Sequence, residues 1–305
     1  MSDPLFTLAI PTYNNEKTIE KAISSCLDQK TDASYEILIV NNASSDNTGN
    51  IIEQYKENKK IRIVTNDETV TLFENHNVCL ENAFGKYLIY CHSDDALEDH
   101  AITTFAKKLE QRSYPKKYVL WGHSMFRDYS KQYVKKAGFS INEMLTGEYA
   151  PLAFMYGGLT PSGTCFSRES FLEMGGYLKT THKVAPSDMT SMIYLAMYGF
   201  RFEMTDEMVF KREDASNAIA LGLDSYLEEI DDAYKHFIDQ VDTESISELI
   251  TLSSKQKNKP FYFYYAIAQA SEFKPKIKRI IVRNLIKYPW RLNNPLFQKI
   301  LKRVF

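Results

Sequence analysis

Lys86-Tyr-Leu-Ile-Tyr-Cys-His-Ser-Asp-Asp95 is the stretch of the sequence that decides the fold. Its apolar centre, Leu88 to Cys91, is short and rich in β-forming residues, which predicts a strand buried inside a parallel sheet. The strand is followed by the polar residues His92, Ser93, Asp94 and Asp95. Adjacent carboxylates at the end of a core strand are costly unless a cation or solvent meets them, and ligands of open α/β sheets bind at this edge. The stretch therefore predicts a site for Mg²⁺ or Mn²⁺, which prefer oxygen ligands.

The same acidic stretch is also compatible with a solvated turn, in which Glu98 and Asp99 favour the start of the next helix. The segments before it support the ligand site, because runs that predict strands alternate with runs that predict helices. The strands are expected at 6–10, 35–40 and 61–64, and the helices at 19–27, 51–55 and 74–84. This alternation predicts an α/β fold with a mainly parallel sheet flanked by helices. Polar loops at one edge of that sheet predict a nucleotide crevice, although no Gly-x-Gly-x-x-Gly or Walker loop is present.

The composition of the 305 residues is that of a soluble protein, long enough for one large α/β domain with an appendage. No signal-peptide pattern occurs, and no run of about 18 apolar residues predicts a membrane span. The four cysteines are scattered, without the paired spacing of a zinc site or a disulfide framework, which predicts reduced thiols in a cytoplasmic protein. The net charge of -2 hides an asymmetry, since residues 255–305 carry +12 and residues 1–254 carry -14.

Four segments, taken in order along the chain, together resemble the family 2 glycosyltransferases. They are Ala9–Asn14, Ile37–Thr48, Asn77–Tyr87 and His92–Asp95. They are similar to the family's opening strand and turn, its Val-Asp-Asp-x-Ser-x-Asp-x-Thr loop, the lead into its Asp-x-Asp motif, and that motif itself. Two later segments, Leu159–Arg168 and Phe171–Tyr177, resemble the family's turn and strand before the acceptor helix and its helix ending in Gly-Gly-Phe. The resemblance covers residues 5–218 and implies the GT-A fold, a Rossmann-like nucleotide-binding domain joined to an acceptor-binding half.

The resemblance implies a nucleotide pocket and a metal site at the predicted sheet edge. The positions implied to bind the nucleotide are Pro11, Thr12, Tyr13, Asn42, Ser93 and Asp94. Metal binding, to Mn²⁺ or Mg²⁺, is implied for Asp94, with Asp214 and His92 as further candidate ligands. The sequence departs from the family at His92, which replaces the first aspartate of Asp-x-Asp, and at Asn41 and Asn42, which replace two aspartates. The alternatives are a hydrogen bond from His92 to its own loop and a solvated acidic turn at Asp214.

Asp188 matches the aspartate that is the catalytic base of the family, although Ser187 replaces the glutamate that usually precedes it. The alternative is a carboxylate that only favours the first turn of a helix. The implied reaction is inverting transfer of a sugar from a nucleotide diphosphate donor, most commonly a UDP-sugar, to a hydroxyl of a glycan or lipid-linked glycan in cell-surface polysaccharide biosynthesis. A catalytically inactive nucleotide-sugar-binding module and a nucleotidyltransferase are the alternative functions.

The resemblance ends near residue 220, which predicts a GT-A domain at 1–220 and a helical C-terminal extension at 221–305. A hairpin is expected at 202–211, and amphipathic helices at 222–239 and 244–256. Residues 275–305 combine basic with apolar and aromatic side chains, a pattern typical of peripheral binding to an anionic membrane, here the inner face of the cell membrane. Packing on the acidic remainder of the chain, a dimer contact and, less favoured, nucleic-acid binding are the alternatives.

Overall fold

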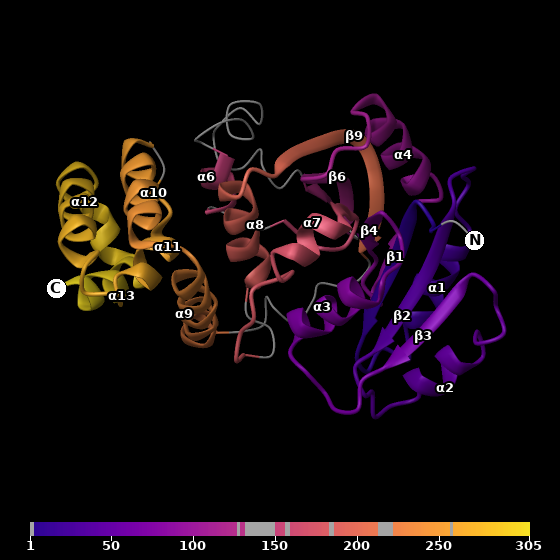
Figure 1. Ribbon diagram of the computed structural model, residues 1–305. Coiled ribbons are helices and arrows are strands. Elements are labelled where there is room, and N and C mark those ends of the chain that lie inside the picture. Colours follow the sequence, from indigo (N-terminus) through magenta and orange to yellow (C-terminus); the bar gives the residue numbers. More distant parts are fainter. Residues whose placement is uncertain are drawn as a thin grey trace. The chain divides into compact units, whose positions relative to one another are not determined.

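The computed structural model describes residues 3–126, 129–131, 150–155, 159–182, 186–212, 222–256 and 259–305 (Figure 1). The chain divides into two compact units. The first comprises Met1–Tyr133, Leu159–Tyr177 and Tyr198–Ser216, and the second comprises Val134–Gly158, Leu178–Met197 and Asn217–Phe305. The division of the sequence into separate domains at 1–220 and 221–305 stays a prediction.

The described residues of the first unit form a nine-stranded sheet in the order β3-β2-β1-β4-β8-β6-β9-β5, with β7 paired to β6. The strands are β1 (Phe6–Thr12), β2 (Tyr35–Asn41), β3 (Ile61–Thr65), β4 (Tyr87–Tyr90), β5 (Asp95–Leu97), β6 (Tyr118–Phe126), β7 (Tyr129–Lys131), β8 (Thr164–Ser167) and β9 (Arg201–Arg212). The pairings from β3 to β4 are all parallel. Beyond β4 the sheet becomes mixed, because β8 is antiparallel to both β4 and β6. The predicted α/β fold and its βαβ units are confirmed.

Helices flank this sheet and follow from the sequence pattern. They are α1 (Ile19–Leu27), α2 (Thr48–Glu53), α3 (Leu72–Asn82), α4 (Ala101–Gln111) and α7 (Arg168–Glu173). The buried residues of α1 are spaced three and four apart, which places them on one face. A capping box starts α3, because the Thr71 side chain accepts from the Glu74 backbone while the Glu74 carboxylate accepts from the Thr71 backbone.

The central strand β4 lies inside the core, as its apolar sequence predicts. Leu88, Ile89 and Tyr90 have no exposed surface. Gly85, just before the strand, allows the backbone of β1 to approach closely, since a Cβ at this position would lie 2.3 Å from the Thr7 nitrogen. A glycine is therefore required where β4 begins to pair with β1.

The strand β1 continues through Pro11 to Thr12, past its expected end at residue 10. Proline has no backbone N–H, so it cannot donate a ladder hydrogen bond and is rarely found where a strand is paired on both sides. It is tolerated here because β4 pairs with β1 only over Phe6–Ala9, so that at Pro11 the ladder is formed with β2 alone. The extra residues carry β1 to the edge of the sheet where the candidate site lies.

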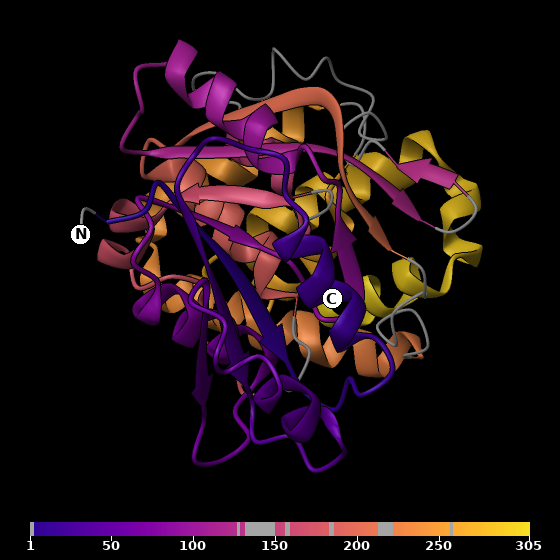
Figure 2. The same cartoon turned by 90° about the vertical axis from the view of Figure 1, so that its right-hand side faces the viewer.

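The hairpin expected at 202–211 is wrong, because this segment is the single long strand β9. The segment contains none of the Gly, Asn or Pro residues that tight hairpin turns favour. It pairs in parallel with β6 through two register shifts, and its end pairs antiparallel with β5. Gly122 of β6 accommodates the irregularity, since a Cβ there would lie 2.5 Å from the Glu207 carbonyl oxygen. β9 bends strongly along its length in both views (Figures 1 and 2).

The described part of the second unit is helical. Its helices are α6 (Ala150–Phe154), α8 (Ser187–Met197), α9 (Leu223–Gln240), α10 (Thr243–Lys255), α11 (Phe261–Ile267), α12 (Lys274–Lys287), the 3₁₀ helix η4 (Pro289–Asn293) and α13 (Pro295–Val304). The expected helices at 222–239 and 244–256 are confirmed as α9 and α10. Aromatic residues of α9 and α11 form their core, with Tyr234 and Phe263 in edge-to-face contact. Among the described residues, no helix is both long enough and apolar enough to cross a bilayer.

Glu203 of β9 holds α4 to the sheet of the first unit. Its carboxylate accepts hydrogen bonds from Arg112 Nε at 2.8 Å, from Lys108 Nζ at 3.2 Å and from the Tyr118 hydroxyl. The bond from Arg112, with those from Tyr118 and Lys108, lowers the pKa of Glu203 from 4.5 to about 2. The charged carboxylate therefore stabilises the folded state.

We predict that Glu203→Gln lowers the free energy of unfolding by about 1–2 kcal/mol at neutral pH, the worth of charge-assisted bonds at a partly exposed site. Because folding lowers this pKa, the stabilisation is complete above pH 4.5 and is lost as the pH falls through about 2. Urea unfolding at a series of pH values measures the difference, with Glu207→Gln, an exposed residue of the same strand, as control. A difference that persists unchanged below pH 2 would show that the carboxylate charge is not its cause.

Candidate active site

Three loops meet at the edge where β1, β2 and β4 end, and backbone and side-chain groups of the first loop connect them by hydrogen bonds. The Asn15 backbone N–H donates at 2.8 Å to Thr48 Oγ1, at the start of α2, where the loop after β2 ends. The Asn15 side-chain oxygen accepts from Ser93 Oγ at 2.7 Å, in the loop after β4. Asn14, whose φ of 53° is left-handed, accepts from the Ser45 N–H at 2.8 Å. The edge is therefore a single connected surface, as the alternating strands and polar loops predict.

The predicted nucleotide-binding residues of the first loop differ in exposure. Pro11 and Thr12 are buried at the end of β1, whereas Tyr13 is 45% exposed. The Thr12 hydroxyl is buried and has no hydrogen-bond partner among the described residues. An unsatisfied buried hydroxyl is rare, and a bound polar ligand or water is the usual explanation. Nucleotide contact by these three residues stays a prediction.

Asn42 uses its amide within the chain. Its oxygen accepts from the Val70 N–H and from Asn66 Nδ2, both at 2.9 Å, and its nitrogen donates to the Val70 carbonyl at 2.9 Å. An aspartate at this position would offer no N–H to that carbonyl. The departure from the family's aspartate therefore has a structural reason. The Asn42 amide forms hydrogen bonds that hold residues 66–70 at the end of β2. Nucleotide contact by Asn42 stays a prediction.

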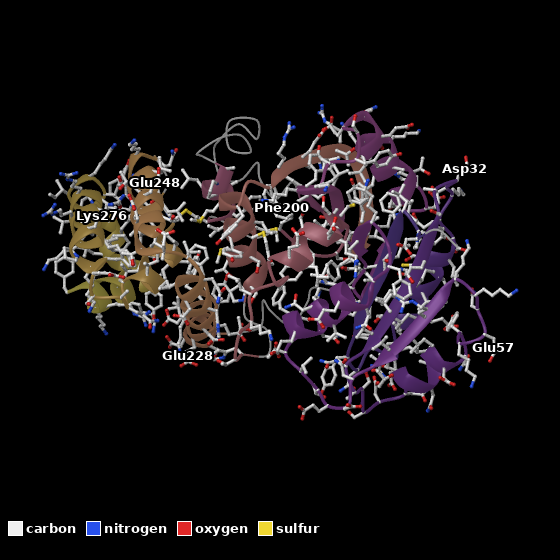
Figure 3. The ribbon with its side chains drawn as sticks, in the orientation of Figure 1. Asp32, Glu57, Phe200, Glu228, Glu248 and Lys276 are labelled. Carbon is white, nitrogen blue, oxygen red and sulfur yellow. The ribbon has the colours of Figure 1, made fainter. Side chains whose placement is uncertain are left out.

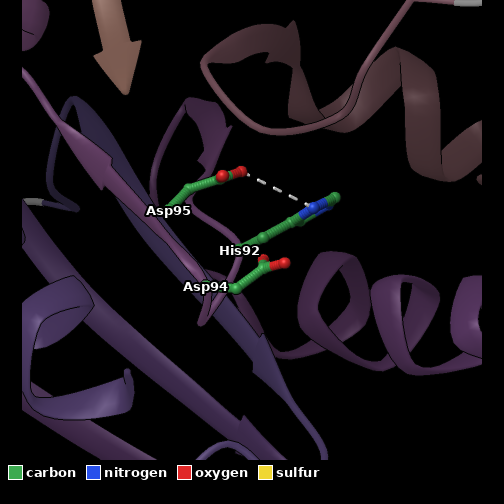
Figure 4. Close-up of side chains that lie close together, drawn as sticks. All are labelled: His92, Asp94 and Asp95. Atoms are coloured by element: carbon green, nitrogen blue, oxygen red, sulfur yellow. Dashed lines mark ion pairs between the residues drawn. The ribbon is translucent and has the colours of Figure 1, made fainter. Parts of the chain in front are cut away.

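A group of potential metal ligands lies in the loop after β4 and at the first residue of β5 (Figure 4). His92, Asp94 and Asp95 each offer one ligand atom, and these atoms all lie within 4.8 Å of one another. His92 Nδ1 lies 3.8 Å from Asp95 Oδ2. The His92 backbone N–H donates to Ser162 Oγ at 3.1 Å, which fixes the loop against the turn before β8. The structure thus brings together Asp94 and His92, two of the predicted metal ligands.

Asp95 belongs to this group although it is not among the predicted ligands. It is the first residue of β5, and its exposed fraction is 3%. The short strand β5 is held in place by antiparallel pairing with the end of β9. The sequence shows the carboxylate beside Asp94 but gives no sign that a three-residue strand would turn it toward His92.

A second histidine, His76 of α3, decides which ring nitrogen of His92 donates a hydrogen bond. His76 Nδ1 lies 2.7 Å from the Leu72 carbonyl oxygen, which can only accept, so this nitrogen carries the proton. Burial, together with the nearby His92, lowers the pKa of His76 to about 3, so the ring is neutral. His76 Nε2 is therefore an acceptor, and it lies 2.9 Å from His92 Nε2.

The proton of that bond must come from His92 Nε2, so in the neutral form of the His92 ring Nδ1 is the nitrogen with a free lone pair. Nδ1 is the atom beside Asp95. An outer histidine that sets the tautomer of an inner one is the arrangement that orients metal-binding imidazoles. His76 was missed by sequence reasoning, because its position on a helix far from the motif gives no signal of the contact.

The other two predicted residues lie elsewhere in the chain. Asp188 is in the second unit, in the first turn of α8, where its Oδ1 accepts from the Met189 N–H at 2.9 Å. Burial and, after it, the charge of Asp188 raise the pKa of Tyr226 to about 12, which places this hydroxyl near the carboxylate. The catalytic role of Asp188 stays a prediction. Asp214 lies outside the described residues.

Comparison with known proteins points to one family. The profile described as "Glycosyl transferase family 2" matches residues 7–171. A stretch of 95 residues is 35% identical to the Escherichia coli UDP-Glc:alpha-D-GlcNAc-diphosphoundecaprenol beta-1,3-glucosyltransferase WfgD. That match covers 31% of this chain and 37% of WfgD, so the chain spans little more than a third of that relative.

Solved structures share the fold at low sequence identity. Staphylococcus aureus TarS 1-349 in complex with UDP-GlcNAc superposes with a TM-score of 0.64 at 15% identity, over 100% of this chain and 89% of that chain. The mannosyltransferase PcManGT from Pyrobaculum calidifontis, in complex with GDP-Man and Mn2+, superposes with a TM-score of 0.52 at 17% identity, over 100% and 86% of the two chains. The profile match covers more than half of this chain. The protein belongs to glycosyl transferase family 2 and has the GT-A fold.

Proposed function

We propose that this protein is an inverting glycosyltransferase that moves a sugar from a nucleotide diphosphate donor, a UDP-sugar in the first instance, to a hydroxyl of a glycan or lipid-linked glycan in cell-surface polysaccharide biosynthesis. The observation that carries the proposal is the group His92, Asp94 and Asp95 at the convergent strand ends of a family 2 fold. UDP-GlcNAc is bound by TarS, and a diphosphoundecaprenol-linked sugar is named in the description of WfgD. These names motivate the choice of donor and acceptor class.

The ligand group fits a divalent cation. One imidazole nitrogen and two carboxylates, within 4.8 Å of one another, suit Mn²⁺ better than Mg²⁺, which demands oxygen ligands in strict octahedral geometry. A cation bound there would neutralise the charge that grows on the leaving diphosphate. His92, Asp94 and Asp95 would hold it, and Asp214 remains a further candidate ligand.

The chain's own residues would supply the remaining functions. Asp188 would take the proton of the acceptor hydroxyl, which is a poor nucleophile without a base. Pro11, Thr12, Tyr13 and Asn42 would line the nucleoside pocket. Ser93 would keep the metal loop in place through its bond to Asn15 while its oxygen contacts the diphosphate. A single displacement of this kind inverts the anomeric configuration.

A panel of nucleotide sugars separates this function from its alternatives. Calorimetry with UDP and Mn²⁺, followed by hydrolysis of each donor, should show metal-dependent binding and turnover of one donor class. Binding without any turnover, with or without an acceptor, would favour an inactive binding module. Formation of a sugar nucleotide from a sugar phosphate and a nucleoside triphosphate would favour a nucleotidyltransferase.

The metal site predicts that Asp94→Ala weakens UDP binding in the presence of Mn²⁺ far more than in its absence. The lost carboxylate is a ligand of the cation, whereas nucleoside contacts remain. Calorimetry with and without a chelator measures both affinities. Asp32→Ala is the matched control, because this exposed aspartate precedes β2 and so lies at the opposite end of the strands (Figure 3). Equal weakening with and without chelator contradicts the metal role.

The histidine pair predicts that His76→Phe weakens Mn²⁺ affinity by about 10–100-fold, the usual effect of losing an outer partner of a metal-binding histidine. Phenylalanine keeps a ring among the aromatic neighbours Phe73, Tyr90 and Tyr177 but removes the acceptor for His92. His76→Gln retains an acceptor and should lose less. The affinity is measured by paramagnetic resonance of free Mn²⁺ in a titration, with thermal unfolding as a check on the fold. If both variants lose the same affinity, the loss comes from packing.

The base assignment predicts that Asp188→Asn leaves donor affinity nearly unchanged and lowers the transfer rate by about 10²–10⁴-fold, the usual worth of a general base. Asparagine has almost the same shape and can still accept from the Met189 N–H. Transfer and UDP affinity are measured in parallel, with Asp239→Asn, an exposed position of α9, as control. A variant with the wild-type rate would leave Asp188 only a role in starting the helix.

A further inference from the structure

Apart from the exposed Lys274 and Lys302, the basic side chains of residues 274–305 fall into two sets, and the first set is used in packing within the second unit. Lys276, labelled in Figure 3, donates to the Ser247 carbonyl oxygen at 2.7 Å. Arg291 donates to Asn284 Oδ1 at 2.7 Å and lies over the Phe261 ring. Two further basic residues form ion pairs with α9, Lys299 with Asp224 and Arg303 with Asp231. Packing within the chain, one of the alternatives given for residues 275–305, therefore explains the presence of these four charged side chains.

The second set lies on one exposed side of α12, which we call the outer face. It consists of Lys278, Arg279, Val282, Arg283, Ile286 and Lys287, all exposed, and Trp290 follows in η4. The buried side of the helix carries Ile277, Ile281 and Asn284 instead. In the described part of the second unit, ion pairs join Lys299, Arg303 and His236 to aspartates, and none includes a basic residue of the outer face. Residues 274–305 contain no acid.

Large apolar side chains lie among these charges. Ile286 is 78% exposed and Trp290 is 65% exposed, and Val282 and Leu292 also lie at the surface. Together with Phe305, they make up five of the nine exposed large hydrophobic side chains in the described chain. Single exposed hydrophobic residues are common, but a cluster of this kind marks an interaction surface. A partner of this surface must therefore offer both negative charge for the cations and an apolar environment for the hydrophobic side chains.

We propose that the outer face of α12, with Trp290, binds the surface of an anionic lipid bilayer. Its arginine and lysine side chains would meet lipid phosphates, while Ile286 and Trp290 insert at headgroup level, as amphipathic interfacial helices do. A second copy of the chain is disfavoured, because a symmetric contact would set this row of cations against itself. Nucleic acid offers phosphates but no apolar layer for isoleucine and valine. The proposal is independent of the reaction proposed above.

Sedimentation of the full chain with vesicles tests the proposal. We expect binding to vesicles of phosphatidylglycerol and phosphatidylcholine at low salt, release as salt is raised, and little binding to phosphatidylcholine alone. The triple variant Arg279→Gln, Arg283→Gln, Lys287→Gln should bind about 100-fold more weakly, from about 1 kcal/mol for each basic side chain near an anionic leaflet. Ile286→Ser with Trp290→Ser should lower binding by about tenfold or more through lost apolar insertion.

Matched controls keep the test specific to this face. Lys59→Gln, Lys107→Gln and Lys116→Gln remove three exposed charges of the first unit and should leave vesicle binding unchanged. All changed side chains are exposed, so circular dichroism and thermal unfolding should match the wild type, and hydrolysis of a soluble donor should persist. Equal loss in the control variant overturns the proposal. So does binding to single-stranded RNA without binding to vesicles, or a lipid-free dimer that the outer-face variant abolishes.

Discussion

The parallel register of β4 and β2 on β1 is the constraint on which the candidate site depends. It sets the carboxyl ends of three strands side by side, so that the loops after them share one edge. Each loop is polar, and without fixed partners its backbone would move independently. The Asn15 side-chain oxygen and backbone N–H supply those partners by bonding Ser93 and Thr48. The parallel pairing of the core strands therefore determines at which edge of the sheet the loops meet. The two hydrogen bonds of Asn15 then hold these loops together as one surface.

Burial of a neutral histidine is the second physical element of the site. In water His76 would titrate near neutral pH, but in the aromatic core burial lowers its pKa to about 3. A ring that cannot charge must accept at one nitrogen when the other donates, and the Leu72 carbonyl decides which one donates. The consequence reaches the surface, because His92 must then present Nδ1 toward the carboxylate of Asp95. Desolvation inside the first unit thus determines which nitrogen of the His92 ring donates to His76.

The strong positive charge of the C-terminal segment serves two purposes in the structure. Part of it is neutralised by the aspartates of α9 or is used in hydrogen bonds to backbone and side-chain oxygens. Another part lies on the outer face of α12 beside exposed apolar side chains. Net charge alone does not distinguish these roles, because a lysine that pairs with an aspartate in the fold counts the same as one that faces solvent. A cation that faces solvent can act on a partner, whereas one that pairs with an aspartate of α9 is already neutralised.

The sequence alone determined the alternation of strands and helices, the family, the edge of the sheet that holds the site, and Asp94 with His92 as members of the ligand group. These follow from local periodicity and from motifs whose spacing fits within one loop. The tertiary structure decided that 202–211 is one strand, that β5 turns Asp95 into the group, that His76 contacts His92, and that Asn42 holds residues 66–70. It also decided which tail cations face outward. Each of these depends on contacts between residues far apart in the chain, and periodicity within a segment carries no information about a partner in another segment.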